Sequence, residues 1–400
     1  MRGLRLGHLW LPLVIALYLV GCASLPRDAV TPDLADKVAV LNGAPVRYWG
    51  DRVPDNMDAL AREKWAQVKA TRPQLLQKGR RPVISFLAVS GGGSDGAFGA
   101  GLLVGWTARG DRPEFDIVTG ISTGALTAPF AFLGPRYDGA LKDIYTKYST
   151  DELVTKQPIR GLLGGEALAS NAPLARVIAT YVDEDFLKEV AREHARGRRL
   201  LIGTTNLDAQ RPVIWDMGRI ASSGDPRALQ LFRSVLLASA AIPGLFPPVY
   251  IKVQGEGQVR EEMHVDGGTT NQVFLLPNQI EAGSIDAKLG INPIRHLYIV
   301  RNGRLDPEFK VVKASTLAIA GRSISTLIKT QGIGDLYQMY ELARRNRIDY
   351  NLAYIPGDFR DTSTEAFDPV YMSRLFDLGF QSGKSGHPWK KTPPRLEGRS

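Results

Sequence analysis

The residues best suited to chemistry are Gly120, Ser122 and Gly124, which form a Gly-X-Ser-X-Gly motif. In such a motif the serine occupies a sharp turn between a strand and a helix, where the flanking residues must be small. Residues 115–119 are rich in β-branched side chains and predict the strand, and the small residues 125–128 predict the start of the helix. Ser122 is therefore a candidate nucleophile. The motif alone is weak evidence, because the chain contains 41 glycines.

A second glycine-rich segment, residues 90–101, precedes the serine motif. It follows the apolar run 83–89, which is typical of a buried parallel strand, and leads into small apolar residues that predict a closely packed helix over 97–106. Glycines at a strand-to-helix junction leave backbone N–H groups open to an anion. In acyl transfer that anion is the tetrahedral oxyanion, and such donors lower the barrier by a few kcal/mol.

A carboxylate completes the set of candidate reactive groups. Asp266 ends an expected strand and is followed by Gly267 and Gly268. Reactive groups gather at the carboxyl ends of parallel strands, so a carboxylate there can reach a neighbouring strand end. Asp266 and Ser122 are far apart in the sequence, and only the fold can bring them together.

In order and spacing these three segments resemble the patatin-like phospholipase family. Residues 204–208 and 238–249 resemble two further family segments, an internal strand and a small-residue helix that ends in a proline turn. The resemblance implies a catalytic dyad of Ser122 and Asp266, without a cofactor or metal. It implies an oxyanion hole formed by Gly91, Gly92, Gly93 and Thr123. The remaining motif glycines are Gly96, Gly120, Gly124, Gly267 and Gly268.

The implied fold class is α/β: a three-layer α/β/α domain with a central, mostly parallel sheet over residues 82–280. We expect a C-terminal αβ extension over 281–380, with strands at 297–300 and 351–355 and helices near 315–330, 335–345 and 369–378. Residues 22–81 are expected to form a polar tether with one helix near 57–69, and residues 381–400 a basic disordered tail.

One position departs from the family pattern. Asp95 stands where the family usually carries Arg or Lys. A cation there would favour an oxyanion or a phosphate headgroup, so the departure concerns the preference for phospholipid more than the ester chemistry. We expect Asp95 to cap the following helix through its backbone N–H groups.

Several alternatives to the dyad remain open. Gly91, Gly93 and Gly96 also spell Gly-X-Gly-X-X-Gly, but the next strand ends at Gly120 without the acid that a dinucleotide site requires. A Ser-His-Asp esterase would need a histidine, and His296 follows Asp266 in the order typical of α/β-hydrolases. The other histidines are His8 in the leader, His194 on an expected solvated helix, His264 beside Asp266, and His387 in the tail. An acyltransferase using the same serine and a catalytically silent lipid-binding lipoprotein also fit.

The N-terminus indicates export. Arg2 and Arg5 precede the apolar run 9–20, which is too short to span a bilayer comfortably and is typical of a signal peptide over residues 1–21. Residues 19–24 resemble a bacterial lipobox with Cys22 as the lipidated residue, and Ala23 after it implies the outer membrane, facing the periplasm. Cys22 is the only cysteine, which excludes an internal disulfide and a thiolate metal cluster.

Charge and composition favour lipid as the partner. The formal net charge is +9, and the last residues of the chain are rich in lysine and arginine, which suits an anionic lipid surface. The basic residues are not interleaved with aromatics on a periodic face, so nucleic acid is not an expected partner. Membrane lipids or lipid esters are the expected substrates, with phospholipid, lysophospholipid, neutral ester and thioester all compatible. The oligomeric state is left open.

Overall fold

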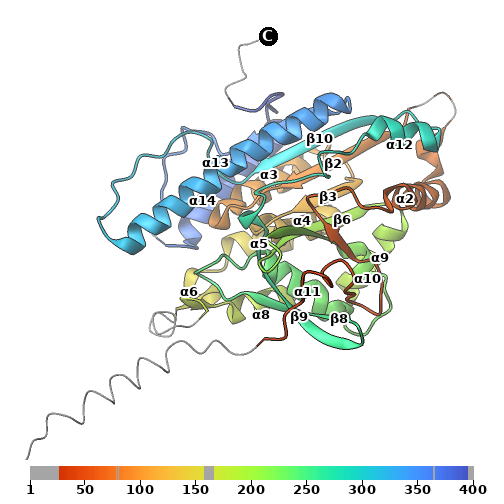
Figure 1. Ribbon diagram of the computed structural model, residues 1–400. Helices are drawn as coiled ribbons and strands as arrows, with labels where there is room; N and C mark the ends of the chain where they lie inside the picture. Colours follow the sequence, from red (N-terminus) through yellow and green to blue (C-terminus); the bar gives the residue numbers. More distant parts are fainter. Residues whose placement is uncertain (1–26, 78, 80, 157–165, 364, 395–400) are drawn as a thin grey trace, which may run out of the picture.

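The computed structural model of the protein describes residues 27–77, 79, 81–156, 166–363 and 365–394. Among these residues, nine strands form one sheet with helices on both faces (Figure 1). Its strands are β1 (Arg47–Trp49), β2 (Val83–Val89), β3 (Ile117–Gly120), β6 (Arg199–Asn206), β7 (Arg211–Asp216), β8 (Val249–Gly255), β9 (Gln258–Asp266), β10 (Ile294–Arg301) and β11 (Asp349–Tyr354). The predicted strand over 83–89 is confirmed at both ends, as β2.

The sheet is mostly parallel, which confirms the predicted fold class. Strands β6, β3, β2, β10 and β11 run parallel in that order. Strands β1 and β7 add an antiparallel edge, and the β8–β9 hairpin pairs antiparallel with the end of β6. The expectation that Asp266 ends a parallel strand is therefore corrected, because it ends an antiparallel one. A separate two-stranded sheet joins β4 (Thr155–Lys156) and β5 (Ala169–Ser170).

Helices cover both faces of the sheet. They are α2 (Met57–Thr71), α3 (Gly96–Arg109), α4 (Thr123–Leu133), α5 (Asp138–Thr146), α6 (Thr150–Leu153), α8 (Ala172–Tyr181), α9 (Glu184–Ala195), α10 (Met217–Ala221), α11 (Ala228–Ser239), α12 (Ala282–Leu289), α13 (Thr316–Arg345) and α14 (Pro369–Ser385). Short 3₁₀ turns occur at Pro73–Leu76, Gly93–Asp95, Pro135–Tyr137 and Gly267–Thr269. The two helices expected near 315–330 and 335–345 are one continuous helix, α13.

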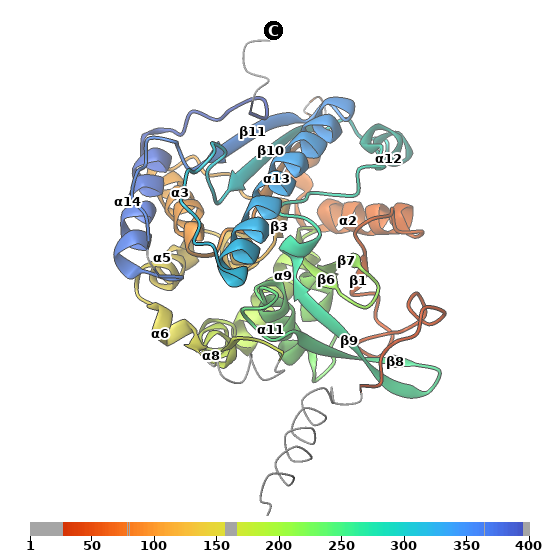
Figure 2. The ribbon, with the colours of Figure 1, turned by 60° about the vertical axis from the view of Figure 1, so that its left-hand side comes forward.

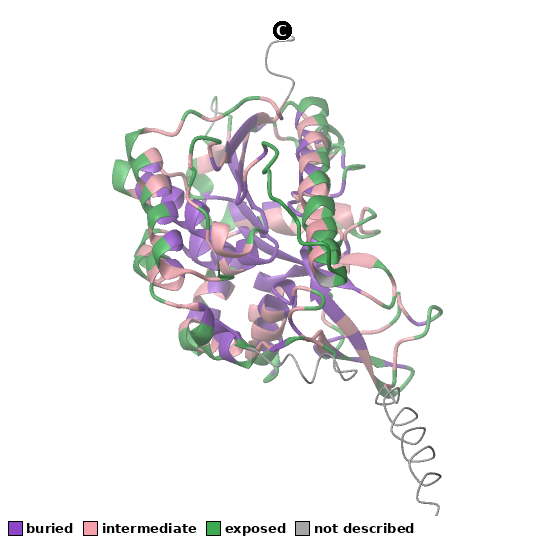
Figure 3. Cartoon of the chain, turned by 90° about the vertical axis from the view of Figure 1, so that its left-hand side faces the viewer, coloured by how far each residue is buried: buried purple, intermediate pink, exposed green. Residues whose placement is uncertain are grey.

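Alternate residues of the strands supply two separate cores. Leu87 and Val89 of β2 pack in the core with α3, α4, α11 and α14, whereas Phe86 and Ala88 face the opposite core with α13. Figure 2 shows α13 and α14 on opposite sides of the sheet, and Figure 3 shows buried strands beside a largely exposed N-terminal half of α13. No helix within the described ranges is long and apolar enough to span a membrane.

The C-terminal part of the chain is built into the domain. Strand β10 pairs with the central strand β2, and α14 packs along α3. The two helices approach so closely that a Cβ at Gly101 would lie 2.0 Å from the carbonyl oxygen of Phe376, and one at Gly105 would lie 2.0 Å from that of Phe380. Residues 281–380, expected as an extension, therefore complete the central sheet and its helical layer.

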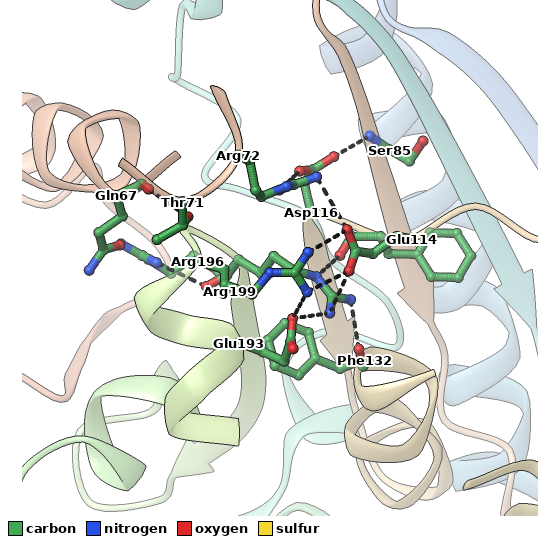
Figure 4. A network of polar contacts seen from close by, with 12 residues as sticks. Gln67, Thr71, Arg72, Ser85, Glu114, Asp116, Phe132, Glu193, Arg196 and Arg199 are labelled. Atoms are coloured by element: carbon green, nitrogen blue, oxygen red, sulfur yellow. Dashed lines mark hydrogen bonds and ion pairs between the residues drawn. The ribbon is translucent and has the colours of Figure 1, made fainter. Parts of the chain in front are cut away.

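Residues 27–77 do not form the expected tether. Strand β1 joins the sheet beside β7, and Leu34, Leu41 and Val46 are buried. The end of α2 is held by a buried ion pair, in which Arg72 donates to the Asp116 carboxylate at 2.7 Å (Figure 4). Burial of the apolar side chains in this segment stabilises its packing against the rest of the domain.

The expected disordered tail is also partly ordered. Residues 381–385 belong to α14, the Trp389 ring packs 5.1 Å from that of Trp106, and Lys390 exchanges backbone hydrogen bonds with Leu352. Residues 395–400 lie outside the described residues. So do residues 1–26, with the expected signal peptide and Cys22.

Candidate active site

Ser122 occupies the turn between β3 and α4. Its backbone has φ 55° and ψ −125°, a conformation that is strained for a residue with a side chain. Gly124 permits this turn to lie against β2, since a Cβ there would be 2.2 Å from the carbonyl oxygen of Val89. The Ser122 N–H donates to the Ser239 hydroxyl at 3.0 Å. The local geometry is that of a nucleophile elbow.

Asp266 lies beside Ser122, although the two are distant in the sequence. It ends β9 opposite Thr204 of β6, is 5% exposed, and accepts a hydrogen bond from the Gly268 N–H at 2.7 Å. The Ser122 hydroxyl lies close enough to the carboxyl group to lower the pKa of Asp266. Burial raises the pKa of Asp266 to about 6, and Ser122 and the hydrogen bond from Gly268 oppose that rise. The pair is arranged for proton transfer near neutral pH.

The glycine-rich loop supplies some of the expected oxyanion donors. The N–H groups of Gly92, Gly93 and Thr123 have no hydrogen-bond acceptor among the described residues, and Gly93 and Thr123 border a cavity together with Ser122. The expectation that Gly91 donates to the oxyanion is corrected, because its N–H already donates to the Gln272 carbonyl oxygen at 3.0 Å. Its lack of a side chain keeps the loop close to Ser122, since a Cβ there would lie 3.1 Å from the Cβ of Ser122.

The other motif glycines sit where segments of the site touch. A Cβ at Gly96 would lie 2.2 Å from the Thr123 hydroxyl, and one at Gly120 would lie 2.3 Å from the Gly124 carbonyl. A Cβ at Gly267 would lie 2.4 Å from a β6 carbonyl, and one at Gly268 would lie 2.5 Å from the Gln272 side chain. These positions therefore set the packing of the three motifs against one another.

Two residues at the end of β10 hold the glycine-rich loop and were missed in the sequence. Arg301 donates to the Ser90 hydroxyl at 3.1 Å and to the Gly91 carbonyl at 3.0 Å. Asn302 donates to the Ser90 carbonyl at 2.9 Å and accepts from the Gly99 N–H at 3.1 Å. Both follow the strand predicted at 297–300, and their position at a carboxyl strand end was the available signal.

Gln272 is a further residue that the sequence did not single out. Its side chain donates to the Gly268 carbonyl at 2.8 Å, and its own carbonyl accepts from Gly91. Its N–H donates at 2.6 Å to Asp335 of α13. Gln272 thus links the loop after Asp266 to the glycine-rich loop, and α13 holds the link in place.

Asp95 does not cap α3. Its backbone is helical, with φ −65° and ψ −14°, and its carboxylate makes no bond to the N–H groups of the first turn. Instead it accepts a hydrogen bond from the Tyr371 hydroxyl of α14 at 2.7 Å. Burial raises the pKa of Asp95, and the hydrogen bond from Tyr371 opposes that rise. The carboxylate is thus engaged with α14.

A cavity opens beside Ser122 and Thr123. It encloses about 810 Å³, including the part open to solvent. Its walls come from α4, α8, α11, α14 and the loop after α11, and include Leu126, Phe130, Ile178, Leu236, Phe246 and Met372. An almost entirely apolar lining next to a reactive serine suits a hydrocarbon chain.

No histidine among the described residues hydrogen-bonds to Ser122 or Asp266. His264 is fully buried between Thr204, at 3.0 Å, and Glu262, at 3.1 Å. His296 contacts Asp349 and pairs in register with Ser85, about 13 Å along the strand from the position of Val89, which pairs with Gly120.

The two remaining described histidines also have structural surroundings. His387 bonds to Ser382 at 2.7 Å. His194 is buried on α9, contrary to the expected solvated helix, because it shares a face with the buried Phe186 and Val190. His8 lies outside the described residues. Within the same ranges no group of His, Cys, Asp and Glu is suited to hold a metal ion.

The layered α/β fold thus places a serine in a strand-to-helix turn, with a buried carboxyl group and an apolar cavity beside it. Residues 87–277 match the family described as patatin-like phospholipase, and this part of the chain belongs to that family.

Two solved structures are similar at low identity. VipD from Legionella pneumophila is 12% identical, with 76% of this chain and 66% of VipD covered and a TM-score of 0.38. Human GIVD cytosolic phospholipase A2 is 10% identical, with 85% and 64% covered and a TM-score of 0.33. The chain thus spans slightly less than two thirds of either protein. No curated protein sequence matches it.

Proposed function

We propose that the protein is a lipid acyl hydrolase in which Ser122 is the nucleophile and Asp266 the general base. The observation that carries this proposal is the proximity of the Asp266 carboxyl group to Ser122, which borders an apolar cavity. The alcohol of a serine needs a base to become nucleophilic, and Asp266 is the titratable group beside it.

The reaction then follows acyl-enzyme chemistry. The Ser122 oxygen forms a bond to the ester carbonyl carbon while its proton moves to Asp266. The N–H groups of Gly92, Gly93 and Thr123 stabilise the resulting oxyanion. When the carbon–oxygen bond to the leaving alcohol breaks, Asp266 returns the proton to that alcohol. Water, deprotonated by the same carboxylate, then attacks the acyl carbon. The bond between that carbon and Ser122 Oγ breaks, Asp266 returns the proton to Oγ, and the carboxylic acid is released.

The substrate is proposed to be an ester with a long acyl chain. The cavity wall carries Leu126, Phe130 and Ile178 and is almost entirely apolar, so the acyl chain would lie inside and the alcohol part outside. Asp95 need not oppose the oxyanion, because its carboxylate is bonded to Tyr371.

Labelling with a long-chain fluorophosphonate tests the nucleophile, and release of p-nitrophenol from the octanoate ester tests turnover. We expect Ser122→Ala to lose the label and to lose activity by up to about a million-fold. Ser94→Ala, which removes a nearby serine of the glycine-rich segment, should keep both. An unlabelled native protein would favour the silent lipid-binding alternative, and native-like turnover in Ser122→Ala would refute the assignment.

We also propose that the protein is anchored by a lipidated Cys22 at the outer membrane, facing the periplasm. The support is the leader-like residues 1–21 and the lipobox-like residues 19–24. Stable anchoring requires more than one acyl chain, which a lipoprotein N-terminus provides. Cys22→Ser should leave the leader uncleaved and change membrane fractionation. Normal processing and unchanged recovery with outer membranes would contradict the anchor.

A further inference from the structure

A second cavity lies on the opposite face of the sheet from Ser122. It encloses about 1180 Å³, including the part open to solvent. Its floor is Ile84, Phe86, Ile117 and Leu201, from three neighbouring strands. Helices α2 and α12 border it, and it shares no lining residue with the cavity beside Ser122. Helices normally fill such a sheet face, so an open apolar space there calls for an occupant.

Two polar groups at this cavity lack partners. Trp65 is only 5% exposed, and its buried indole N–H has no hydrogen-bond acceptor among the described residues. The ammonium group of the neighbouring Lys64 makes no hydrogen bond or ion pair within the described ranges. A polar group without a partner costs free energy when it lies away from water, so the Lys64 ammonium indicates a missing acceptor in this cavity.

The charges around the cavity favour an anion. Burial lowers the pKa of Lys64 to about 8, with Arg199 and Arg295 contributing and Asp116 opposing, so the amine is still mainly protonated at neutral pH. The acids of the lining are already engaged. Asp286 forms a two-point ion pair with Arg295, at 2.8 and 2.5 Å, and Asp216 lies in the field of Arg199. Lys64 is thus a cation without a counter-ion.

We propose that this cavity binds a long-chain carboxylate, with the hydrocarbon on the sheet floor and the carboxylate against the Lys64 ammonium. An ammonium group forms a charge-assisted hydrogen bond with a carboxylate oxygen. Helix α12 borders the cavity and is tied to α2 by the ion pair between Lys288 and Asp58 at 2.6 Å. This binding does not depend on the proposed reaction at Ser122.

Quenching of tryptophan fluorescence by 9,10-dibromostearate tests the site in the full chain, because Trp65 lines this cavity and no tryptophan lines the other. We expect the native protein to be quenched, and Trp65→Phe to lose most of that quenching. Lys64→Met should weaken binding of the carboxylate by about tenfold or more and leave binding of the corresponding bromo-alcohol unchanged. Lys69→Met, on the exposed side of the same helix, should bind like the native protein.

A steric pair completes the experiment. Ala61 lines the cavity and Ala59 is exposed, so Ala61→Phe should abolish binding of both ligands while Ala59→Phe should not. Circular dichroism checks that each variant is folded. If Ala61→Phe does not fold, the comparison of Lys64→Met with Lys69→Met still tests the binding site. Unchanged binding in Lys64→Met, or quenching that persists in Trp65→Phe, would overturn the proposal. Because this test measures ligand binding and not ester hydrolysis, its outcome does not depend on whether Ser122 is a nucleophile.

Discussion

Replacing Asp266 by asparagine should remove activity and, at neutral pH, increase stability. The pKa of Asp266 rises from 3.8 to about 6 on folding, so its ionised form costs the folded state about 3 kcal/mol relative to the unfolded chain. Asparagine has a similar shape and carries no charge to bury. The same burial that makes Asp266 a useful base therefore opposes folding.

The sign of the pH dependence follows from the two pKa values. Because the folded value lies above the unfolded one, the folded protein binds more protons between about pH 4 and pH 6. The contribution of Asp266 to stability is fully present below this window and is lost as the pH rises through it. Asp266→Asn lacks this loss, so its free energy of unfolding relative to the native protein should increase by up to about 3 kcal/mol from pH 4 to pH 7.5.

Urea unfolding at several pH values, followed by tryptophan fluorescence, measures this difference. Ser122→Ala is the matched control, because it is also expected to be inactive but retains the Asp266 carboxyl and should keep the native pH dependence. In the native protein, kcat/KM should fall about tenfold per pH unit below pH 6, as the base becomes protonated. Parallel stability curves for native protein and Asp266→Asn would refute the reasoning.

Three further substitutions test the support of the site. Asp116→Ala should destabilise the protein by about 1–3 kcal/mol in urea unfolding, because it removes the buried partner of Arg72 and leaves only the exposed Glu114 at 3.5 Å; a loss below 1 kcal/mol would contradict this. Gly124→Ala should abolish fluorophosphonate labelling, since its Cβ would meet the Val89 carbonyl at 2.2 Å, and a normally labelled variant would show that the turn can move. Asn302→Ala should lower kcat by about a hundredfold with little change in KM, by loosening the glycine-rich loop, and an unchanged kcat would remove that role.

The sequence predicted best what depends on short segments. The strand over 83–89 is a continuous apolar run, and its bounds agree with β2. The resemblance to the family predicted that Ser122 and Asp266 belong together, and in the structure the two residues are neighbours. The burial of His194 was also within reach of the sequence, since Phe186, Val190 and His194 recur at helical spacing.

What the sequence did not predict depends on distant partners. Asp95 looked like a helix cap, but its partner Tyr371 comes from a helix near the other end of the chain. Whether the Gly91 N–H is free depends on the Gln272 carbonyl, and local sequence carries no information about that contact. The same holds for residues 27–77, whose apolar side chains are too scattered to indicate a packed segment until the sheet is known.

The position of β2 between β3 and β10 has a consequence for how the protein matures. Strand β10 follows β2 in the sequence by about half the chain, and α14 follows its packing partner α3 by an even longer stretch. During synthesis, the central strand therefore has an open edge until most of the chain has emerged, and such non-local pairing makes folding slow. A product that stops before α14 would expose the close-packing glycines of α3 and lack the partner of Asp95. Loss of the last few dozen residues should thus give an aggregation-prone chain, so that assembly of the hydrolytic centre is deferred until translation is nearly complete.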